Sequence, residues 1–322
     1  MIRMRNAARQ NSLLLGFCGL GFAVAACKQA PPVIVASDPT QTLTVMVGDA
    51  RRSFTLHTPP KLDPTTPAPL VLVFHGSGGT GAGTQKLTHF NDVSDVHGFL
   101  VAYPDGIDKH WNIGADAKAG ADDLAFVSTM LEQIAQKHPV DPNRIYACGM
   151  SNGGFFTFRL ACEMSDRFAA IATVGAGILA ESARTCKPTK AIPLAMFNGD
   201  ADPLIPYAGG KVRATRFRAE DNILSAEASI RFWAELNACQ SDFESSDFPV
   251  VDEKDDTRVS RIRVGVGREN AVVELFTIHG GGHTWPGGYQ YLGERLIGKT
   301  TRQIDASEEI WKFFSGFPSR SR

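Results

Sequence analysis

The sequence lacks an excess of charge of either sign, and it lacks a long hydrophobic run. Its 322 residues contain 33 Lys and Arg against 34 Asp and Glu, a formal net charge of −1. DNA and RNA need a basic surface, so this balance excludes nucleic acid as an expected partner. The only extended apolar run ends at Ala26 and has about 14 residues, too few to cross a bilayer. Internal repeats are also absent, and 43% hydrophobic residues is ordinary for a globular protein.

The N-terminal segment has the pattern of an export signal. Three arginines and no acidic residue precede the apolar run. The run ends in Val-Ala-Ala-Cys at 24–27, which resembles the lipobox of bacterial lipoproteins. This resemblance implies cleavage before Cys27 and a lipid on its sulfur and amine, whereas a plain signal peptide is the alternative. Lys28 after the cysteine would, in a Gram-negative lipoprotein, imply sorting to the outer membrane. We therefore expect an exported protein, either a periplasmic or cell-surface lipoprotein or a secreted one.

This pattern divides the chain into three parts. Residues 1–26 are expected to form the signal peptide, and 27–42 a tether that contains three prolines. Residues 43–318 are expected to form one folded domain, because no second linker follows and single α/β domains reach this length. A membrane contact would then run through a lipid anchor at Cys27.

Few cysteines are available to the folded domain. Of six, Cys18 leaves with the signal and Cys27 is the expected lipid site. The other four permit three complete pairings, and an exported compartment allows disulfides. We expect Cys162 and Cys186 to pair, because they flank one predicted strand and close a short loop. Cys148 lies in an apolar strand, where a buried free thiol is expected.

Apolar and amphipathic segments alternate along the chain. Three continuous apolar runs are typical of strands covered on both faces of a parallel sheet, at 70–74, 99–103 and 145–148. The other expected elements are helices at 122–137, after Ser151, near 225–236 and near 304–314, and strands near 170–174, 194–197, 259–266 and 272–278. Alternating residues at 43–47 and 53–57 indicate an antiparallel hairpin. The order predicts an α/β fold with a doubly wound, mostly parallel sheet and an N-terminal antiparallel edge hairpin.

Ser151 lies in Gly-Met-Ser-Asn-Gly at 149–153, which matches the pattern G-x-S-x-G. A predicted strand precedes it and a predicted helix follows, which is the context of a nucleophile elbow. Glycines flank the serine because the turn is strained and other backbones pass close by. A serine hydroxyl becomes a strong nucleophile only when a base removes its proton and an acid orients that base.

Candidates for the acid and the base follow in the order that such a fold requires. Asp200 and Asp202 come directly after a predicted strand, and either can be the acid; the other can cap the loop. His283 follows a later strand in a glycine-rich loop. His279 lies four residues earlier, a spacing found in metal sites, but the three intervening glycines argue against a helix. No metal is expected.

A second motif points to a different class of protein. Residues 76–81 match G-x-G-x-x-G after a strand, and Asp105 ends the next strand, as in dinucleotide-binding folds. An exported protein meets little NAD, however, and this interpretation leaves the serine, acid and histidine unexplained. We therefore expect no cofactor.

Several blocks together resemble one family. They are His-Gly-Ser-Gly-Gly at 75–79, Trp-Asn at 111–112, Asp-Asp-Leu-Ala-Phe-Val at 122–127, Gly-Met-Ser-Asn-Gly-Gly at 149–154, Gly-Asp-Ala-Asp-Pro-Leu-Ile-Pro at 199–206 and Gly-Gly-His-Thr-Trp-Pro-Gly at 281–287. In this order the chain resembles the secreted polyhydroxybutyrate depolymerase and feruloyl esterase group, which belongs to carbohydrate esterase family one of the α/β-hydrolases. The resemblance spans about 44–314.

The resemblance implies roles for individual residues. It makes Ser151, Asp202 and His283 the catalytic triad. It assigns the oxyanion hole to the backbone N–H groups of Ser77 and Asn152, which are the residue on an early βα loop and the residue after the nucleophile. Relatives carry a further cysteine between the position of Cys239 and the histidine loop. This chain has none there, so Cys239 is expected to be unpaired.

Trp111 and Trp285 are candidates for substrate binding. Both lie on loops at the carboxyl ends of predicted strands, where open α/β sheets bind ligands. An exposed indole there would suit sugars, feruloyl rings or polyester chains. In the alternative, each tryptophan packs beneath its loop and fixes the oxyanion segment or the histidine.

The expected function is that of an exported serine esterase that cleaves carboxylic esters, small or polymeric, through an acyl-enzyme. By the resemblance it is either like a polyhydroxybutyrate depolymerase or like a feruloyl or acetyl polysaccharide esterase. One alternative is a serine peptidase of the same fold, although the peptidase relatives usually carry a propeller domain for which there is no room. Another is a surface-anchored binding protein without activity. The acyl and alcohol groups, and the oligomeric state, are left open by the sequence.

Overall fold

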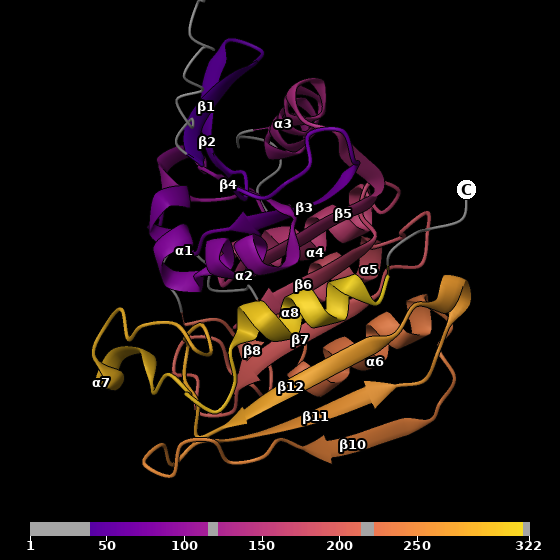
Figure 1. Cartoon of the computed structure of the whole chain (residues 1–322). Coiled ribbons are helices and arrows are strands. Elements are labelled where there is room, and N and C mark those ends of the chain that lie inside the picture. Colours follow the sequence, from indigo (N-terminus) through magenta and orange to yellow (C-terminus); the bar gives the residue numbers. More distant parts are fainter. Residues whose placement is uncertain (1–38, 115–121, 214–221, 318–322) are drawn as a thin grey trace, which may run out of the picture. The chain divides into compact units, whose positions relative to one another are not determined.

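One ten-stranded sheet forms the centre of the structure, a computed structural model that describes residues 39–114, 122–213 and 222–317. The strand order is β1-β2-β4-β3-β5-β6-β7-β12-β11-β10 (Figure 1). The bounds are β1 (Thr40–Val47), β2 (Ala50–His57), β3 (Ala68–Phe74), β4 (Leu100–Pro104), β5 (Val140–Met150), β6 (Ala170–Val174), β7 (Leu194–Gly199), β10 (Phe243–Asp247), β11 (Arg258–Val264) and β12 (Val273–His279). The six central strands run parallel to one another: β4, β3, β5, β6, β7 and β12. At one edge β2 pairs antiparallel with β4, and β1 pairs antiparallel with β2. At the other edge β11 pairs antiparallel with β12, and β10 pairs antiparallel with β11.

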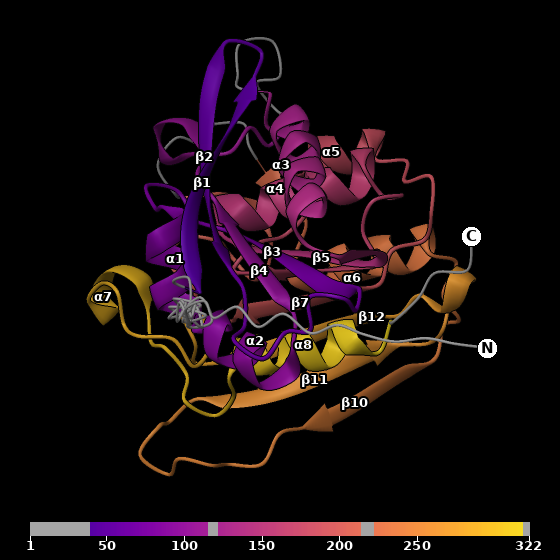
Figure 2. The same cartoon turned by 45° about the horizontal axis from the view of Figure 1, so that its top comes forward.

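Helices cover both faces of the sheet. They are α1 (Gly81–Thr88), α2 (Phe90–His97), α3 (Asp123–Lys137), α4 (Asn152–Glu163), α5 (Ala180–Thr185), α6 (Ala226–Leu236), α7 (Glu294–Ile297) and α8 (Ala306–Ser315). Two short strands, β8 (Gly210–Lys211) and β9 (Asn222–Ile223), form a separate ribbon. Figure 2 shows α3, α4 and α5 on one side of the sheet and α2 and α8 on the other.

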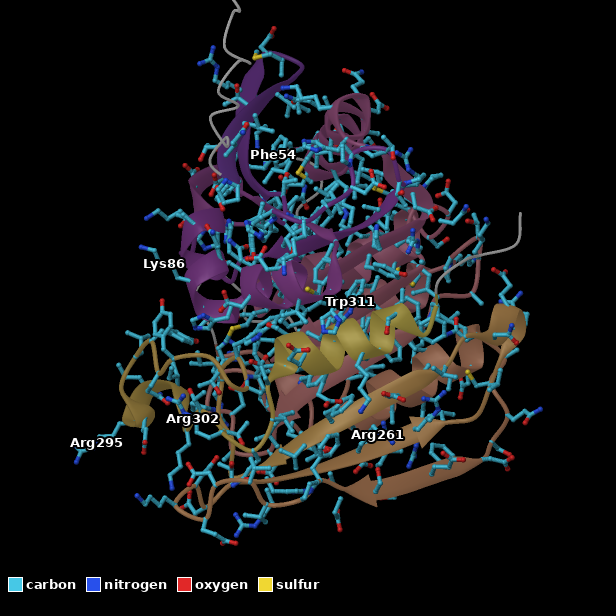
Figure 3. The ribbon with its side chains drawn as sticks, in the orientation of Figure 1. Phe54, Lys86, Arg261, Arg295, Arg302 and Trp311 are labelled. Carbon is cyan, nitrogen blue, oxygen red and sulfur yellow. A yellow bond between two sulfur atoms is a disulfide. The ribbon has the colours of Figure 1, made fainter. Side chains whose placement is uncertain are left out.

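The two faces bury two separate apolar clusters. One joins α3, α4 and α6 to the sheet and includes Phe54; the other joins α2 and α8 to the opposite face and includes Trp311 (Figure 3). Every residue of β3, β4, β6 and β7 is buried, which explains why these segments are mostly apolar, with Thr173 and Asn198 as buried polar exceptions. The predicted doubly wound, mostly parallel sheet with its antiparallel edge hairpin, β1 and β2, is confirmed.

The structure differs from the expectation at both edges of the sheet. Strand β1 begins at Thr40, so the hairpin takes in three residues that were expected to belong to the tether at 27–42. Strand β10 was not predicted, because all five of its residues are exposed and carry no apolar period. It pairs antiparallel with β11 at the other edge.

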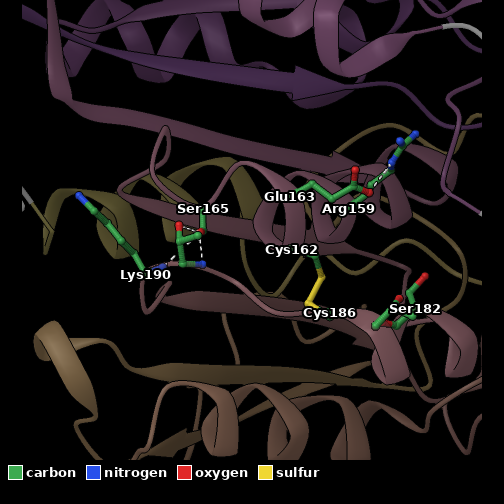
Figure 4. Close-up of a disulfide and its surroundings, with 9 residues drawn as sticks. Arg159, Cys162, Glu163, Ser165, Ser182, Cys186 and Lys190 are labelled. Atoms are coloured by element: carbon green, nitrogen blue, oxygen red, sulfur yellow. Dashed lines mark hydrogen bonds and ion pairs between the residues drawn. A yellow bond between two sulfur atoms is a disulfide. The ribbon is translucent and has the colours of Figure 1, made fainter.

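A disulfide joins Cys162 at the end of α4 to Cys186 just after α5 (Figure 4). This confirms the pairing predicted from the sequence. Cys148 is a free, buried thiol, and burial raises its pKa well above the usual value. Cys239 is also free, as the resemblance implied.

The predicted signal peptide, 1–26, and Cys27 lie outside the residues that the structure describes. Within the described residues, no helix combines the length and the apolar character needed to cross a membrane.

Candidate active site

Ser151 occupies a sharp turn between β5 and α4. Its backbone has φ 54° and ψ −122°, a conformation that costs a non-glycine residue about 1–3 kcal/mol. Its N–H donates to the Val174 carbonyl at 2.9 Å. A Cβ on Gly153 would collide with the carbonyl oxygens of Phe74 and His75, so the helix can start here only with glycine at that position. The strained turn and close approach are the features that the G-x-S-x-G pattern predicts.

Asp202 and His283 form a buried pair. Asp202 Oδ2 lies 2.7 Å from His283 Nδ1, and the side chains are 1% and 3% exposed. The other carboxylate oxygen accepts from the backbone N–H groups of Leu204 and Ile205, at 2.8 and 2.9 Å. Asp202 is thus fixed by its own loop, and it fixes the imidazole in turn.

Asp200, the rival acid, points to a different histidine. Its Oδ2 lies 3.0 Å from His279 Nδ1, and its Oδ1 accepts from the Gly280 N–H at 2.7 Å. It therefore caps the start of the histidine loop, and His279 and His283 pair with different carboxylates. Among the described residues, no group of three or more His, Cys, Asp or Glu side chains is placed to hold a metal ion.

Gly175 links the serine to the histidine. It follows Val174, which binds the Ser151 N–H, and a Cβ at Gly175 would lie 3.0 Å from His283 Nδ1. The three candidate side chains therefore gather where β5, β6 and β7 end. No hydrogen bond joins the Ser151 hydroxyl to His283 within the described residues, and such bonds are often long before substrate binds.

The loop after β3 passes beside the serine. A Cβ on Gly76, the residue before Ser77, would lie 3.4 Å from the Cβ of Ser151. Asn152 opens α4, so its N–H is one of the helix's unpaired donors. Within the described part of the chain, no carbonyl accepts from the backbone N–H of either Ser77 or Asn152. Two donors are thus available next to the serine.

Asp105 bonds to groups of the protein itself in this arrangement. Its carboxylate accepts from the Gly81 N–H and the Ser53 hydroxyl, both at 2.8 Å. Of the glycines at 76–81, Gly76 lets the backbone approach Ser151 closely, and Gly81 is the first residue of α1.

Trp111 is 4% exposed, so the expectation of an indole open to substrate is wrong for this residue. Its Nε1 donates to the His75 carbonyl at 3.0 Å, and its ring stacks on Phe156 at 5.2 Å. Its backbone N–H donates to the Asn152 side chain at 2.7 Å. The alternative, a tryptophan packed beneath its loop, is the arrangement observed.

Trp285 is buried in the same way, with 1% exposure. Its Nε1 donates to the Ser307 hydroxyl at 3.1 Å, and its ring packs edge-on against Phe90. The expectation that it offers a face to substrate is therefore also wrong. It anchors the start of the segment after His283 to α2 and α8.

Residues 291–299, which follow His283 in the chain, fold back and form hydrogen bonds with the backbone at 282–283. The sequence analysis did not predict this contact. The His283 N–H donates to the Ile297 carbonyl at 2.5 Å, and the Gly282 N–H donates to the Lys299 carbonyl at 2.9 Å. The Tyr291 hydroxyl donates to the His283 carbonyl at 2.8 Å. Burial and the nearby Asp202 charge raise the pKa of Tyr291 well above its usual range, so it stays a donor.

Two comparisons identify the family. The sequence profile described as "Esterase PHB depolymerase" matches residues 52–203. The chain is 30% identical over 293 residues to "Putative esterase NocK" of Nocardia uniformis subsp. tsuyamanensis, a match that covers 88% of this chain and 84% of that protein. The chain belongs to the PHB depolymerase family of esterases. It is a carboxylic ester hydrolase.

Other relatives in this esterase family are larger or more distant. Feruloyl esterase B of Piromyces equi is 28% identical over 222 residues, 67% of this chain but only 39% of that protein. The solved structure "Acetyl xylan esterase from Aspergillus awamori" superposes with a TM-score of 0.57 at 14% identity and covers 85% of this chain and 99% of that one. The latter likeness supports the α/β-hydrolase fold.

Proposed function

We propose that this esterase cleaves carboxylic esters by a Ser-His-Asp acyl-enzyme mechanism, with Ser151 as nucleophile, His283 as base and Asp202 as orienting acid. The observation that carries the proposal is the buried 2.7 Å contact between Asp202 and His283 beside the strained turn of Ser151. A carboxylate that accepts from Nδ1–H leaves Nε2 free to take a proton.

The chemical steps follow from these positions. His283 Nε2 takes the Ser151 hydroxyl proton while the oxygen attacks the ester carbonyl carbon. The negative charge that forms on the carbonyl oxygen is stabilised by the N–H groups of Ser77 and Asn152. The imidazolium then gives its proton to the departing alcohol, which leaves the acyl group on the serine. Water, deprotonated by the same imidazole, attacks the acyl-enzyme, releases the acid and restores Ser151.

Replacement of the nucleophile tests this mechanism. Ser151→Ala should lower p-nitrophenyl acetate hydrolysis by more than about a thousandfold. The fold should remain, since the turn depends on its glycines rather than on the hydroxyl. Circular dichroism and the melting temperature provide the folding control. Residual activity above about a thousandth of the parent would refute the triad.

The substrate class is proposed from the relatives. Their names include feruloyl esterase, acetylxylan esterase and poly(3-hydroxyalkanoate) depolymerase activities. We expect an ester of this group: a feruloyl or acetyl ester of a polysaccharide, or a hydroxyalkanoate polyester. A hydrolysis panel of methyl ferulate, acetylated xylan and polyhydroxybutyrate granules, with Ser151→Ala as the blank, will choose among them. Activity on small aryl esters alone would contradict a polymeric substrate.

The proposed site of action is outside the cytoplasm. Residues 1–26 carry the pattern of an export signal, and the disulfide between Cys162 and Cys186 suits an oxidising compartment. We propose that Cys27 is lipidated and anchors the enzyme to a membrane. Cys27→Ser should then shift the mature protein from the membrane fraction to the soluble fraction. A parent protein that is soluble and begins at another residue would contradict the anchor.

A further inference from the structure

A buried ion pair lies behind the loop that carries Trp111. Arg52 Nη2 on β2 and Asp123 Oδ1 at the start of α3 are 2.7 Å apart, and the side chains are 3% and 0% exposed. The guanidinium also lies 4.1 Å over the Phe126 ring. Such a pair adds little net stability compared with apolar side chains of the same size, so stability alone does not explain it.

The second oxygen of Asp123 is bonded toward the active site. Asp123 Oδ2 accepts from the Asn112 N–H at 2.8 Å. One carboxylate therefore connects β2, the inner strand of the edge hairpin, to the loop at 111–112. Burial raises the pKa of Asp123, and the bonds from Asn112 and Arg52 oppose that rise, because both stabilise the charged form.

Trp111, the neighbour of Asn112, contacts both halves of the proposed oxyanion hole. Its backbone pairs at two points with the Asn152 side chain: the Trp111 N–H donates to Oδ1 at 2.7 Å, and Nδ2 donates to the Trp111 carbonyl at 3.3 Å. Its indole donates to the His75 carbonyl, two residues before Ser77. The position of this one residue thus sets the spacing between the two backbone donors.

We propose that the Arg52–Asp123 ion pair positions the oxyanion hole by fixing the loop of Trp111. Arg52 and Asp123 are positioning residues, since they act through Asn112 and Trp111 and not on the ester. The inference rests on the proposed function, because it assumes that Ser77 and Asn152 bind the oxyanion. Donors must lie within about 2.7–3.1 Å of the oxyanion to act, so a small shift of either one lowers the rate.

Loss of the ion pair should lower kcat only partly, because the loop at 111–112 has a second anchor. Arg159 Nη1 on α4 donates to the Asn112 carbonyl at 2.9 Å. Loss of an oxyanion donor costs about 100- to 1,000-fold in kcat. Loss of the Asp123 anchor, which displaces donors without removing them, should lower kcat by about tenfold.

Two variants test the inference. Asp123→Asn keeps the shape, but one amide cannot accept from both Arg52 and Asn112. Arg52→Met with Asp123→Leu removes both charges, so no unpaired charge stays buried and folding is protected. Kinetics on p-nitrophenyl acetate, with active sites counted by an organophosphate burst, exclude loss of folded protein as the cause. We expect kcat per active site to fall about tenfold with KM within about twofold.

Inhibition by phenylboronic acid separates positioning from a merely structural role. Its tetrahedral serine adduct uses the same donors as the transition state, so its inhibition constant should rise by about the same factor as kcat falls. Glu274→Gln is the control: it removes the charge of a buried carboxylate that pairs at 2.6 Å with the partly exposed Arg263, away from the loop at 111–112. This control should leave both values unchanged.

The outcomes distinguish the inference from the proposed function. Unchanged kcat and boronate inhibition per active site in the double variant would overturn the positioning role, even if Asp123→Asn does not fold. The same result in Glu274→Gln as in the test variants would also overturn it, because the loss of a buried, paired carboxylate anywhere in the sheet would then have the same effect. An active Ser151→Ala protein would instead refute the proposed function itself.

Discussion

Gly175 lies against the imidazole of His283, so close that a methyl group on it would sit 3.0 Å from Nδ1. The same glycine has φ +57°, which favours glycine over any residue with a side chain. Asp202 Oδ2 would lie 3.7 Å from the added methyl. Gly175, which directly follows β6, therefore packs directly against both His283 and Asp202.

Gly175→Ala should impair catalysis more than stability. The methyl group would push His283 from its place, and a misplacement of about 1 Å can cost about 100-fold in rate. Gly48→Ala is the matched control, because Gly48 has φ +56° and nothing within 4 Å of an added Cβ. Both variants should lose about 1–2 kcal/mol of unfolding free energy. Equal esterase activity in the two would contradict this account.

Asp202→Asn and Asp200→Asn should differ strongly. An amide at 202 favours the wrong histidine tautomer and should lower kcat by about 10⁴-fold. An amide at 200 weakens the cap on Gly280 and should cost no more than about tenfold. Steady-state kinetics on one small ester measure both. The reverse ranking would move the orienting role to Asp200.

Tyr291→Phe should lower kcat several-fold with KM unchanged. The change removes one hydrogen bond to the His283 carbonyl, worth about 0.5–1.5 kcal/mol. Tyr146→Phe is the control, since it removes a hydroxyl that donates to the Phe317 carbonyl and should affect stability alone. Active-site titration is needed to correct for folded protein. A loss of the same size in both variants would argue against a role in holding the histidine.

His75 should make the protein less stable in mild acid. Burial lowers its pKa below the ordinary 6.5, and its Nε2 accepts from the Gly106 N–H at 2.9 Å. Between pH 6.5 and the lowered pKa, His75 is protonated in the unfolded chain but neutral in the folded chain. The free energy of unfolding therefore falls as the pH drops from 6.5 through the lowered pKa. Urea unfolding at several pH values should show a smaller acid loss in His75→Gln. Identical pH dependence in both proteins would exclude His75 as the cause.

Local patterns were enough to predict the elements that carry the site. The buried strands are continuously apolar because both faces are covered, and the turn at Ser151 needs glycines within three residues of it. These features depend on neighbours along the chain, so the sequence displays them. The disulfide between Cys162 and Cys186 was predictable for the same reason, since it closes a short loop around one strand.

The two tryptophans show where this reasoning failed. A loop position at the carboxyl end of a strand suggested exposure, but exposure depends on what packs over the loop. Trp285 is covered by α8, whose Ser307 bonds its indole and lies 22 residues away in the sequence. Nothing in the local sequence around Trp111 indicates that its indole bonds the carbonyl of His75, 36 residues before it.

The sequence by itself predicted the layered fold and a candidate nucleophile, because the first follows from periodicity and the second from a rigid local turn. The family resemblance implied Asp202 as the acid, but the residue pattern alone left Asp200 open, and only the tertiary structure showed that Asp202 meets His283, 81 residues away. Only the tertiary structure showed that Asp123 joins Arg52 to the loop at 111–112. The reason is physical. Contacts between strand ends depend on the register and twist with which distant segments pack, and no local pattern specifies these.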